Sequence, residues 1–238
     1  DIIQRVPSIA IDASDVIHVT WYGLTPNESE GRQIKYAKST NNGKNWSEAV
    51  IPSLVEGYKD NDYWQEHPQI LVKGNNLYIV WEGKDEKNEE QQVKFAKSTN
   101  GGKTWSQWKN VQPGEENTQS RPYLIFDSNN NLNLFMYSSR ENDSQQIWHS
   151  VSADQGETWN DWTKVSDGLG DSRHASATLM GSKILTAWRS EFNSKSQIYF
   201  SIYSENNWSK PELVMQNDNY QFFPVVGTNK NNDVAVTW

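Results

Sequence analysis

The 238-residue sequence predicts an all-β chain made from one repeated unit of four short antiparallel strands. Apolar strands end in an aromatic residue at spacings of 60, 56, 51 and 50, at Trp21, Trp81, Tyr137, Trp188 and Trp238. No helical periodicity competes with the alternating pattern of these segments. Four short strands in about 50 to 60 residues is the period of a β-propeller blade.

Each repeat opens with two strands. The second strand ends at the recurring aromatic, and the first covers residues 8–11, 69–72, 123–126, 177–179 and 225–226 in the successive copies. Proline precedes the first strand in four copies, at Pro7, Pro68, Pro122 and Pro224, and Ala175 takes its place in the fourth. The start of a strand is one of the few positions where a sheet tolerates proline, so this pattern supports the strand assignment.

A third strand is expected at residues 34–38, 93–97, 147–151 and 198–203, and a polar turn follows each copy. The turns read STNNGKNW (39–46), STNGGKTW (98–105), SADQGETW (152–159) and a shorter SENNW (204–208). Serine and Asx side chains bond nearby backbone amides, while glycine supplies a positive φ. A fourth strand is expected after each turn.

These turns resemble the Asp-box, or BNR repeat, of sialidase-like β-propellers, whose pattern is S-x-D-x-G-x-T-W. The third turn matches fully with Asp154, whereas Asn41 and Asn100 replace the aspartate in the first two. The resemblance implies structural hairpins at the outer ends of blades. One carboxylate supplies too few ligands for calcium, so we expect no metal and no cofactor.

We expect one propeller domain over residues 1–238, with blades at about 5–55, 66–114, 120–168 and 173–216 and a partial blade at 221–238. That gives four full blades and the inner half of a fifth. The resemblance implies six blades, so the expectation is a chain cut from a longer propeller. Closure by a partner chain and an open arc are the alternatives.

Composition restricts the partners. The formal net charge of −8 argues against nucleic acid as the main partner, and no apolar run is long enough to insert into a membrane. The chain has no cysteine, which excludes disulfides and a thiol nucleophile. Asn-X-Ser sequons, for example at Asn45 and Asn207, are compatible with an extracellular or cell-surface location.

The resemblance also implies where a ligand binds. In this family the channel face carries the start of each first strand and the loop after each second strand. Charged and aromatic residues gather at these places, which suits a glycan or another polar or anionic ligand. The candidate ligand-binding residues are Arg5, Tyr63, Trp64, Glu66, His67, Glu82, Arg121, Arg140, Arg173, His174, Arg189 and Glu191.

Gln4-Arg5-Val6-Pro7 resembles the F/Y-R-I-P motif of sialidases, whose arginine grips the substrate carboxylate, although Gln4 replaces the aromatic. Arg173 has the same offset, and Arg189 resembles an arginine of later sialidase blades. The tyrosine nucleophile and the aspartate of that family find no counterpart here, so no catalytic residue is assigned.

Three functions stay open at this point. The first is a non-enzymatic extracellular propeller that binds glycan or protein through the channel face. The second is a glycoside hydrolase of the exo-sialidase type, incomplete here, whose arginines hold a carboxylated sugar. The third is a purely structural repeat module.

Overall fold

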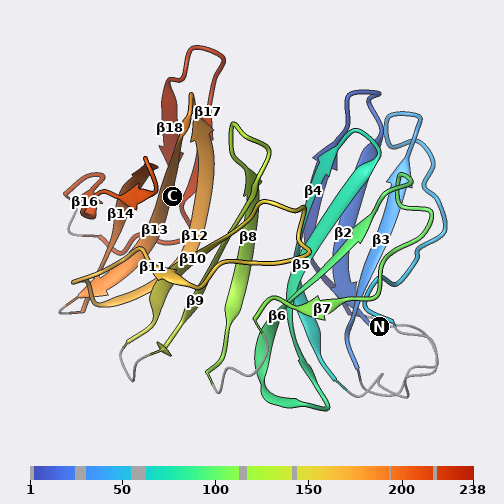
Figure 1. Cartoon of the computed structure of the whole chain (residues 1–238), viewed down its shortest axis with the longest axis horizontal. Coiled ribbons are helices and arrows are strands. Elements are labelled where there is room, and N and C mark those ends of the chain that lie inside the picture. The colour runs from blue at the N-terminus through green and yellow to red at the C-terminus, as the bar shows by residue number, and fades with distance from the viewer. Residues whose placement is uncertain are drawn as a thin grey trace. The chain divides into compact units, whose positions relative to one another are not determined.

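A computed structural model describes residues 3–24, 31–54, 63–112, 117–140, 144–192, 194–216 and 219–238, without the side chain of Glu89. The regular structure of these residues consists of strands β1 to β18 (Figure 1). Within the same residues, no helix has the length and apolar character needed to cross a bilayer. The chain divides into two compact units, an N-terminal unit of residues 1–122 and a C-terminal unit of residues 123–238.

The N-terminal unit holds two antiparallel sheets whose strands follow chain order. The first consists of β1 (Gln4–Ile11), β2 (Ile17–Gly23) and β3 (Gln33–Ser39). An isolated bridge between Tyr36 and Val50 takes the place of its fourth strand. The second sheet consists of β4 (Gln65–Lys73), β5 (Asn76–Asp85), β6 (Asn88–Ser98) and β7 (Lys109–Asn110).

Strand β8 (Ser120–Phe126) spans the boundary between the units and pairs with β9 (Leu132–Ser138), which continues to β10 (Gln146–Ser152) and β11 (Thr163–Lys164). The next sheet contains β12 (Asp171–Met180), β13 (Lys183–Phe192), β14 (Lys195–Ser204), β15 (Asn207–Trp208) and β16 (Glu212–Leu213). Strands β17 (Val225–Thr228) and β18 (Val234–Thr237) form a two-stranded sheet. The four-stranded antiparallel repeat that the sequence predicts is therefore confirmed.

Apolar side chains fill the space between neighbouring sheets of each unit. In the N-terminal unit, Tyr22, Ile34 and Tyr36 of the first sheet pack against residues of the second that include Ile79 and Trp81. In the C-terminal unit, one buried cluster centres on Phe135 and Trp188, and a second joins β13 and β14 to β17 and β18. The second-strand residues Trp81 and Trp188 are scaffold residues, because both are fully buried, whereas the equivalent Trp238 is 43% exposed.

The Asp-box-like turns are closed by the same hydrogen bonds in three repeats. The hydroxyl oxygens of Ser39, Ser98 and Ser152 accept from the amides of Gly43, Gly102 and Gly156 at 2.9, 3.0 and 2.7 Å. The side-chain oxygens of Asn41, Asn100 and Asp154 each accept from the amide four residues later at 2.9 Å. Hydrogen bonds from Thr158 hold the pKa of Asp154 below its usual range. These contacts make the turns structural, as the sequence predicts.

The repeat alignment is wrong by one residue in the third copy. In the first, second and fourth copies, one backbone amide of the third strand donates to a side-chain oxygen, that of Ser53, Gln119 or Gln221 in turn. The residue that carries this amide lies opposite Tyr22, Glu82 or Arg189, respectively. In the third copy Ser166 accepts from Ile147, which lies opposite Tyr137. Tyr137 is therefore equivalent to Tyr22, Glu82 and Arg189, and Met136 is equivalent to the repeated tryptophan.

Candidate functional site

The residue before each first-strand proline, or before Ala175, has a left-handed backbone. Its φ is 48° at Val6, 51° at His67, 52° at Arg121, 58° at His174 and 51° at Phe223. The ladder shifts register here, between Arg5 and Ser8, Glu66 and Gln69, and Arg173 and Ser176. A positive φ is uncommon outside glycine, and a bulge redirects the side chains beside it. The backbone therefore takes the same left-handed conformation at the start of every first strand, where His67, Arg121 and His174 are predicted site residues.

In the N-terminal unit this turn brings Glu66, His67 and Glu82 together. Glu66 and Glu82 lie directly opposite each other on β4 and β5. His67 Nδ1 lies 2.5 Å from Glu82 Oε1 and 3.9 Å from Glu66 Oε2. The second carboxylate oxygen of Glu82 accepts from the backbone amide of Arg121. Three predicted residues thus form one connected group, fixed in part through the backbone of a fourth.

Two further residues complete this group, and the sequence analysis did not select either. The guanidinium of Arg32 pairs with Glu66 and lies 4.8 Å from the ring centre of Trp64 and 6.0 Å from that of Tyr22. Tyr22 also contacts the ring of His67 edge-on at 5.4 Å. Trp64 is half exposed, whereas the side chains of Glu66 and Glu82 are nearly buried. We call Tyr22, Arg32, Trp64, Glu66, His67 and Glu82 the Glu66 cluster.

The Glu66 cluster contains potential metal ligands. One atom from each of Glu66, His67 and Glu82 lies within 4.8 Å of the other two. However, Arg32 already pairs with Glu66, and His67 already hydrogen-bonds Glu82. Each carboxylate therefore has a partner of its own, and a cation would have to displace those partners. The arrangement is better suited to hydrogen bonding with a polar ligand.

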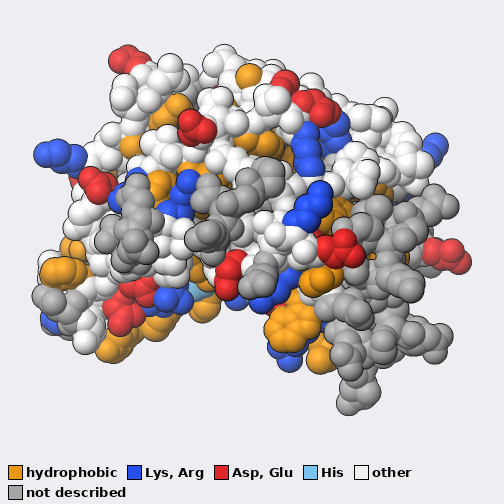
Figure 2. Space-filling view, turned by 60° about the horizontal axis from the view of Figure 1, so that its bottom comes forward, with side chains coloured by type: hydrophobic (Ala, Val, Ile, Leu, Met, Phe, Trp, Pro, Cys, Tyr) orange, Lys and Arg blue, Asp and Glu red, His pale blue; other side chains and the backbone are white. Residues whose placement is uncertain are grey.

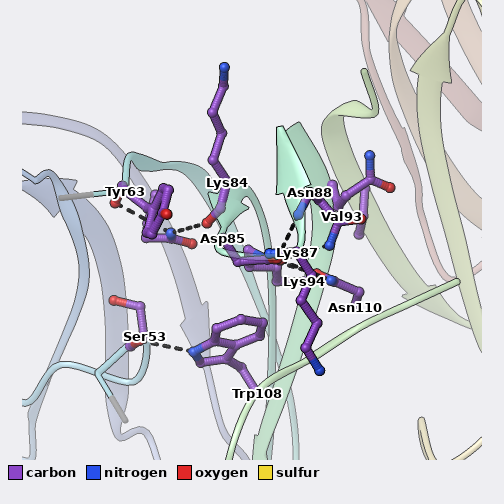
Figure 3. A network of polar contacts seen from close by, with 12 residues as sticks. Ser53, Tyr63, Lys84, Asp85, Lys87, Asn88, Val93, Lys94, Trp108 and Asn110 are labelled. Atoms are coloured by element: carbon purple, nitrogen blue, oxygen red, sulfur yellow. Dashed lines mark hydrogen bonds and ion pairs between the residues drawn. The ribbon is translucent and has the colours of Figure 1, made fainter. Parts of the chain in front are cut away.

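A buried ion pair joins the two strands of the β5–β6 hairpin (Figure 3). Lys94 Nζ lies 2.5 Å from Asp85 Oδ2, 2.8 Å from Asn110 Oδ1 and 4.1 Å from the ring centre of Trp108. Burial lowers the pKa of Lys94 to about 8 although Asp85 opposes this shift. Asp85 also accepts hydrogen bonds from Asn88 within the hairpin turn. The ion pair thus fixes the hairpin that follows Glu82.

In the C-terminal unit, Arg173 and Arg189 lie directly opposite each other on β12 and β13, and each pairs with an acid of its own strand. Arg173 Nε and Nη2 lie 3.1 and 2.8 Å from the two carboxylate oxygens of Asp171. Arg189 Nη2 lies 2.6 Å from Glu191. His174 contacts the ring of Tyr137 at 5.6 Å, and Arg173 lies over the same ring at 5.7 Å. Both guanidinium groups are therefore already paired with carboxylates.

The remaining predicted residues lie apart from these contacts. Arg5 is exposed and lines, with Pro7, Val19 and Trp21, an apolar pocket of about 530 Å³. The guanidinium of Arg140 lies 5.0 Å from the ring centre of Trp148. The carbonyl of Tyr63 accepts from Gln65 Nε2 at 3.4 Å, so its backbone helps to hold the residue before Glu66. Figure 2 shows that basic and acidic side chains are interspersed on the face it displays.

No protein-family model and no curated protein matches the chain. Several solved structures are similar to the chain. An α-L-arabinanase of Penicillium chrysogenum in complex with arabinobiose has a TM-score of 0.73 at 14% identity, covering 98% of this chain and 74% of its own. An α-L-arabinofuranosidase of Fusarium graminearum has a TM-score of 0.69 at 15% identity, and the match covers 98% of this chain and 74% of the enzyme. A Trypanosoma rangeli sialidase in complex with the inhibitor DANA has a TM-score of 0.64 at 16% identity. That match covers 87% of this chain but 37% of the sialidase.

Taken with the four-stranded antiparallel sheets, these similarities show that the fold is a β-propeller of the kind found in glycoside hydrolases. The sialidase-like prediction is confirmed at the level of the fold. The arabinanase and the arabinofuranosidase have higher TM-scores than the sialidase, at similarly low identities.

Proposed function

We propose that this chain is a carbohydrate-binding β-propeller whose Glu66 cluster contacts the sugar. The observation that carries the proposal is the position of an exposed indole ring beside a paired set of charged groups. Trp64 is 50% exposed, and Arg32 joins its ring to Glu66. Sugars present an apolar C–H face that packs on aromatic rings and hydroxyls that bond charged side chains.

We also propose that residues 1–238 form a single propeller domain and that the protein has an extracellular or cell-surface location. The repeated sheets support the first, and the sequons together with a glycan ligand support the second. The other candidate ligand-binding residues, Arg5 and Arg140 among them, stay part of the proposal as contacts of the channel face.

Saturation-transfer NMR and calorimetric titration of the full chain test the proposal, with arabinobiose and 3′-sialyllactose as probes. Trp64→Ala should weaken binding about tenfold, because it removes the exposed stacking surface and leaves the ion pair of Arg32 with Glu66. Trp159→Ala is the control, since Trp159 is partly exposed, closes the turn of the third repeat and belongs neither to the Glu66 cluster nor to the pocket that Arg5 lines. Binding that is equal in the two variants, or absent from wild type, would contradict the proposal.

A glycoside hydrolase is the second candidate, and one observation favours it. Atoms of the Glu66 and Glu82 carboxylates lie within 4.8 Å of each other. Retaining glycosidases use two carboxyl groups about 5–5.5 Å apart, one attacking the anomeric carbon and the other protonating the leaving oxygen, before water releases the sugar. Release of nitrophenol from 4-nitrophenyl α-L-arabinofuranoside that Glu82→Gln abolishes would support catalysis. Turnover of neither this substrate nor a fluorogenic sialoside would leave binding as the function.

A further inference from the structure

An exposed strip of aromatic rings lies at the start of the fifth repeat, a part of the predicted channel face in which none of the candidate ligand-binding residues lies. Tyr220, Phe222 and Phe223 are 61%, 42% and 60% exposed. The rings of Tyr220 and Phe222 are nearly parallel, at 8°, with their centres 6.1 Å apart, and Phe223 lies 6.4 Å from Phe222. Three neighbouring rings therefore offer apolar surface to solvent.

The strip continues into the fourth and third repeats. Phe223 lies 4.6 Å from the ring of His174, which in turn contacts Tyr137. Phe223 and His174 are two of the residues held at positive φ, a conformation that is strained for a bulky side chain. This conformation recurs at the start of every repeat, and in the fifth it is Phe223 that occupies the position. We call Tyr137, His174, Tyr220, Phe222 and Phe223 the aromatic strip.

Hydrogen-bonding groups border the strip. The guanidinium of Arg189 lies 5.2 Å from the ring centre of Phe222 and pairs with Glu191, whose side chain is 40% exposed. Arg189 Nε is buried, and no hydrogen-bond acceptor meets it among the described residues. The accessible group is the carboxylate of Glu191, which Arg189 holds in place and which can accept a hydrogen bond from a ligand hydroxyl.

The charge balance selects the kind of ligand. Asp171 neutralises Arg173, and Glu191 neutralises Arg189. A carboxylated sugar would have to displace one of these acids and would meet its repulsion, whereas a neutral sugar would use both the guanidinium and the carboxylate as hydrogen-bonding partners. The arginines that the sequence suggested for gripping a carboxylate thus favour an uncharged ligand.

We propose that the aromatic strip, together with Arg189 and Glu191, binds a neutral saccharide. The inference rests on the proposed carbohydrate-binding function and adds a second contact region and a ligand class to it. Sugar rings would lie against Tyr220, Phe222 and Phe223, and their hydroxyls would bond Arg189 and Glu191.

Calorimetric titration of the full chain with arabinobiose and, separately, 3′-sialyllactose tests the inference. Phe222→Ala should raise the Kd for arabinobiose about tenfold, and 3′-sialyllactose should bind more weakly than arabinobiose. Phe192→Ala is the control, because Phe192 is 61% exposed and its side chain leaves β13 on the face opposite Glu191. This control should keep the wild-type Kd.

The outcomes separate the two proposals. Loss of binding in Trp64→Ala with none in Phe222→Ala would overturn the strip and leave the Glu66 cluster in place. Loss in Phe222→Ala alone would support the strip and count against the Glu66 cluster. Tighter binding of 3′-sialyllactose would overturn the neutral-ligand assignment. Lower thermal stability of Phe222→Ala with unchanged binding would show that the rings serve packing, which would also overturn it.

Discussion

Gln65 Oε1 accepts a hydrogen bond from Trp81 Nε1 at 2.7 Å, and the first repeat has the same contact between Gln4 and Trp21 at 2.5 Å. The residue opposite Gln65 is Gly83, where a Cβ would lie 2.1 Å from Gln65 Oε1. In the fourth repeat Ser172 and Ser190 occupy the two positions, with their hydroxyls 3.1 Å apart. The buried Nε1 of Trp188 then finds no acceptor among the described residues.

The replacement of the Gln–Gly pair by Ser172 and Ser190 in the fourth repeat predicts that two substitutions compensate each other. Ser172→Gln with Ser190→Gly should raise the free energy of unfolding by about 1 kcal/mol, because it supplies the missing acceptor for Trp188. Ser172→Gln alone should destabilise, since the longer side chain meets Ser190. Urea denaturation of the two single variants and the double variant gives the coupling energy. Simple additivity would show that the repeat equivalence does not hold here.

The buried Asp85–Lys94 pair predicts that removing Asp85 alone destabilises the fold more than removing both charges. Asp85→Asn should lower the free energy of unfolding by about 3–5 kcal/mol, because the buried ammonium of Lys94 then lacks its counter-charge. Combining it with Lys94→Met should recover part of the loss, since no buried charge remains. Denaturant midpoints of the single and double variants test this. A double variant less stable than Asp85→Asn would contradict it.

The same pair predicts a loss of stability in acid. Burial alone would raise the pKa of Asp85, but hydrogen bonds from Lys94 and Asn110 outweigh it and lower the pKa from 3.8 to about 2. A depressed pKa stabilises the folded state above the unfolded value, so Asp85 contributes fully above pH 3.8 and loses its contribution between 3.8 and about 2. The contribution is about 2 kcal/mol. Asp85→Asn should flatten this part of the stability–pH curve, and an unchanged slope would exclude Asp85 as its source.

In the third Asp-box-like turn, we expect an asparagine in place of Asp154 to be tolerated. Asp154→Asn should change the free energy of unfolding by no more than about 0.5 kcal/mol, because Asn100 makes the equivalent bonds, including one of 2.7 Å to Thr104. Asp154→Ala should cost about 1 kcal/mol through the loss of those bonds. Thermal unfolding compares the two variants. Equal destabilisation by both would show that the carboxylate charge is required.

The repeat made the sheets and part of the site predictable. Proline before the first strand locates Glu66 and His67, and the end of the second strand locates Glu82, so local patterns reach three members of the Glu66 cluster. Arg32 could not be found this way, because it lies before the third strand, outside both repeated positions. Its partner Glu66 is 34 residues away, so only tertiary structure shows the pair.

The roles of the C-terminal arginines also depend on tertiary contacts. The sequence places Arg173 and Arg189 at repeat positions that we predict to face a ligand, but it does not show that Asp171 and Glu191 pair with them. The assignment of Tyr137 failed for a simpler reason. The second strand of the third repeat ends Phe-Met-Tyr, so the nearest aromatic lies one position beyond the repeated tryptophan, and the ladder to β10 resolves the difference.

A glycan array probed with the wild-type chain, Trp64→Ala and Trp159→Ala tests the central claim most directly. We expect signal on neutral saccharides from wild type and from Trp159→Ala, and its loss from Trp64→Ala. An array that stays blank with wild type, or a signal that Trp64→Ala retains in full, would contradict carbohydrate binding by the Glu66 cluster.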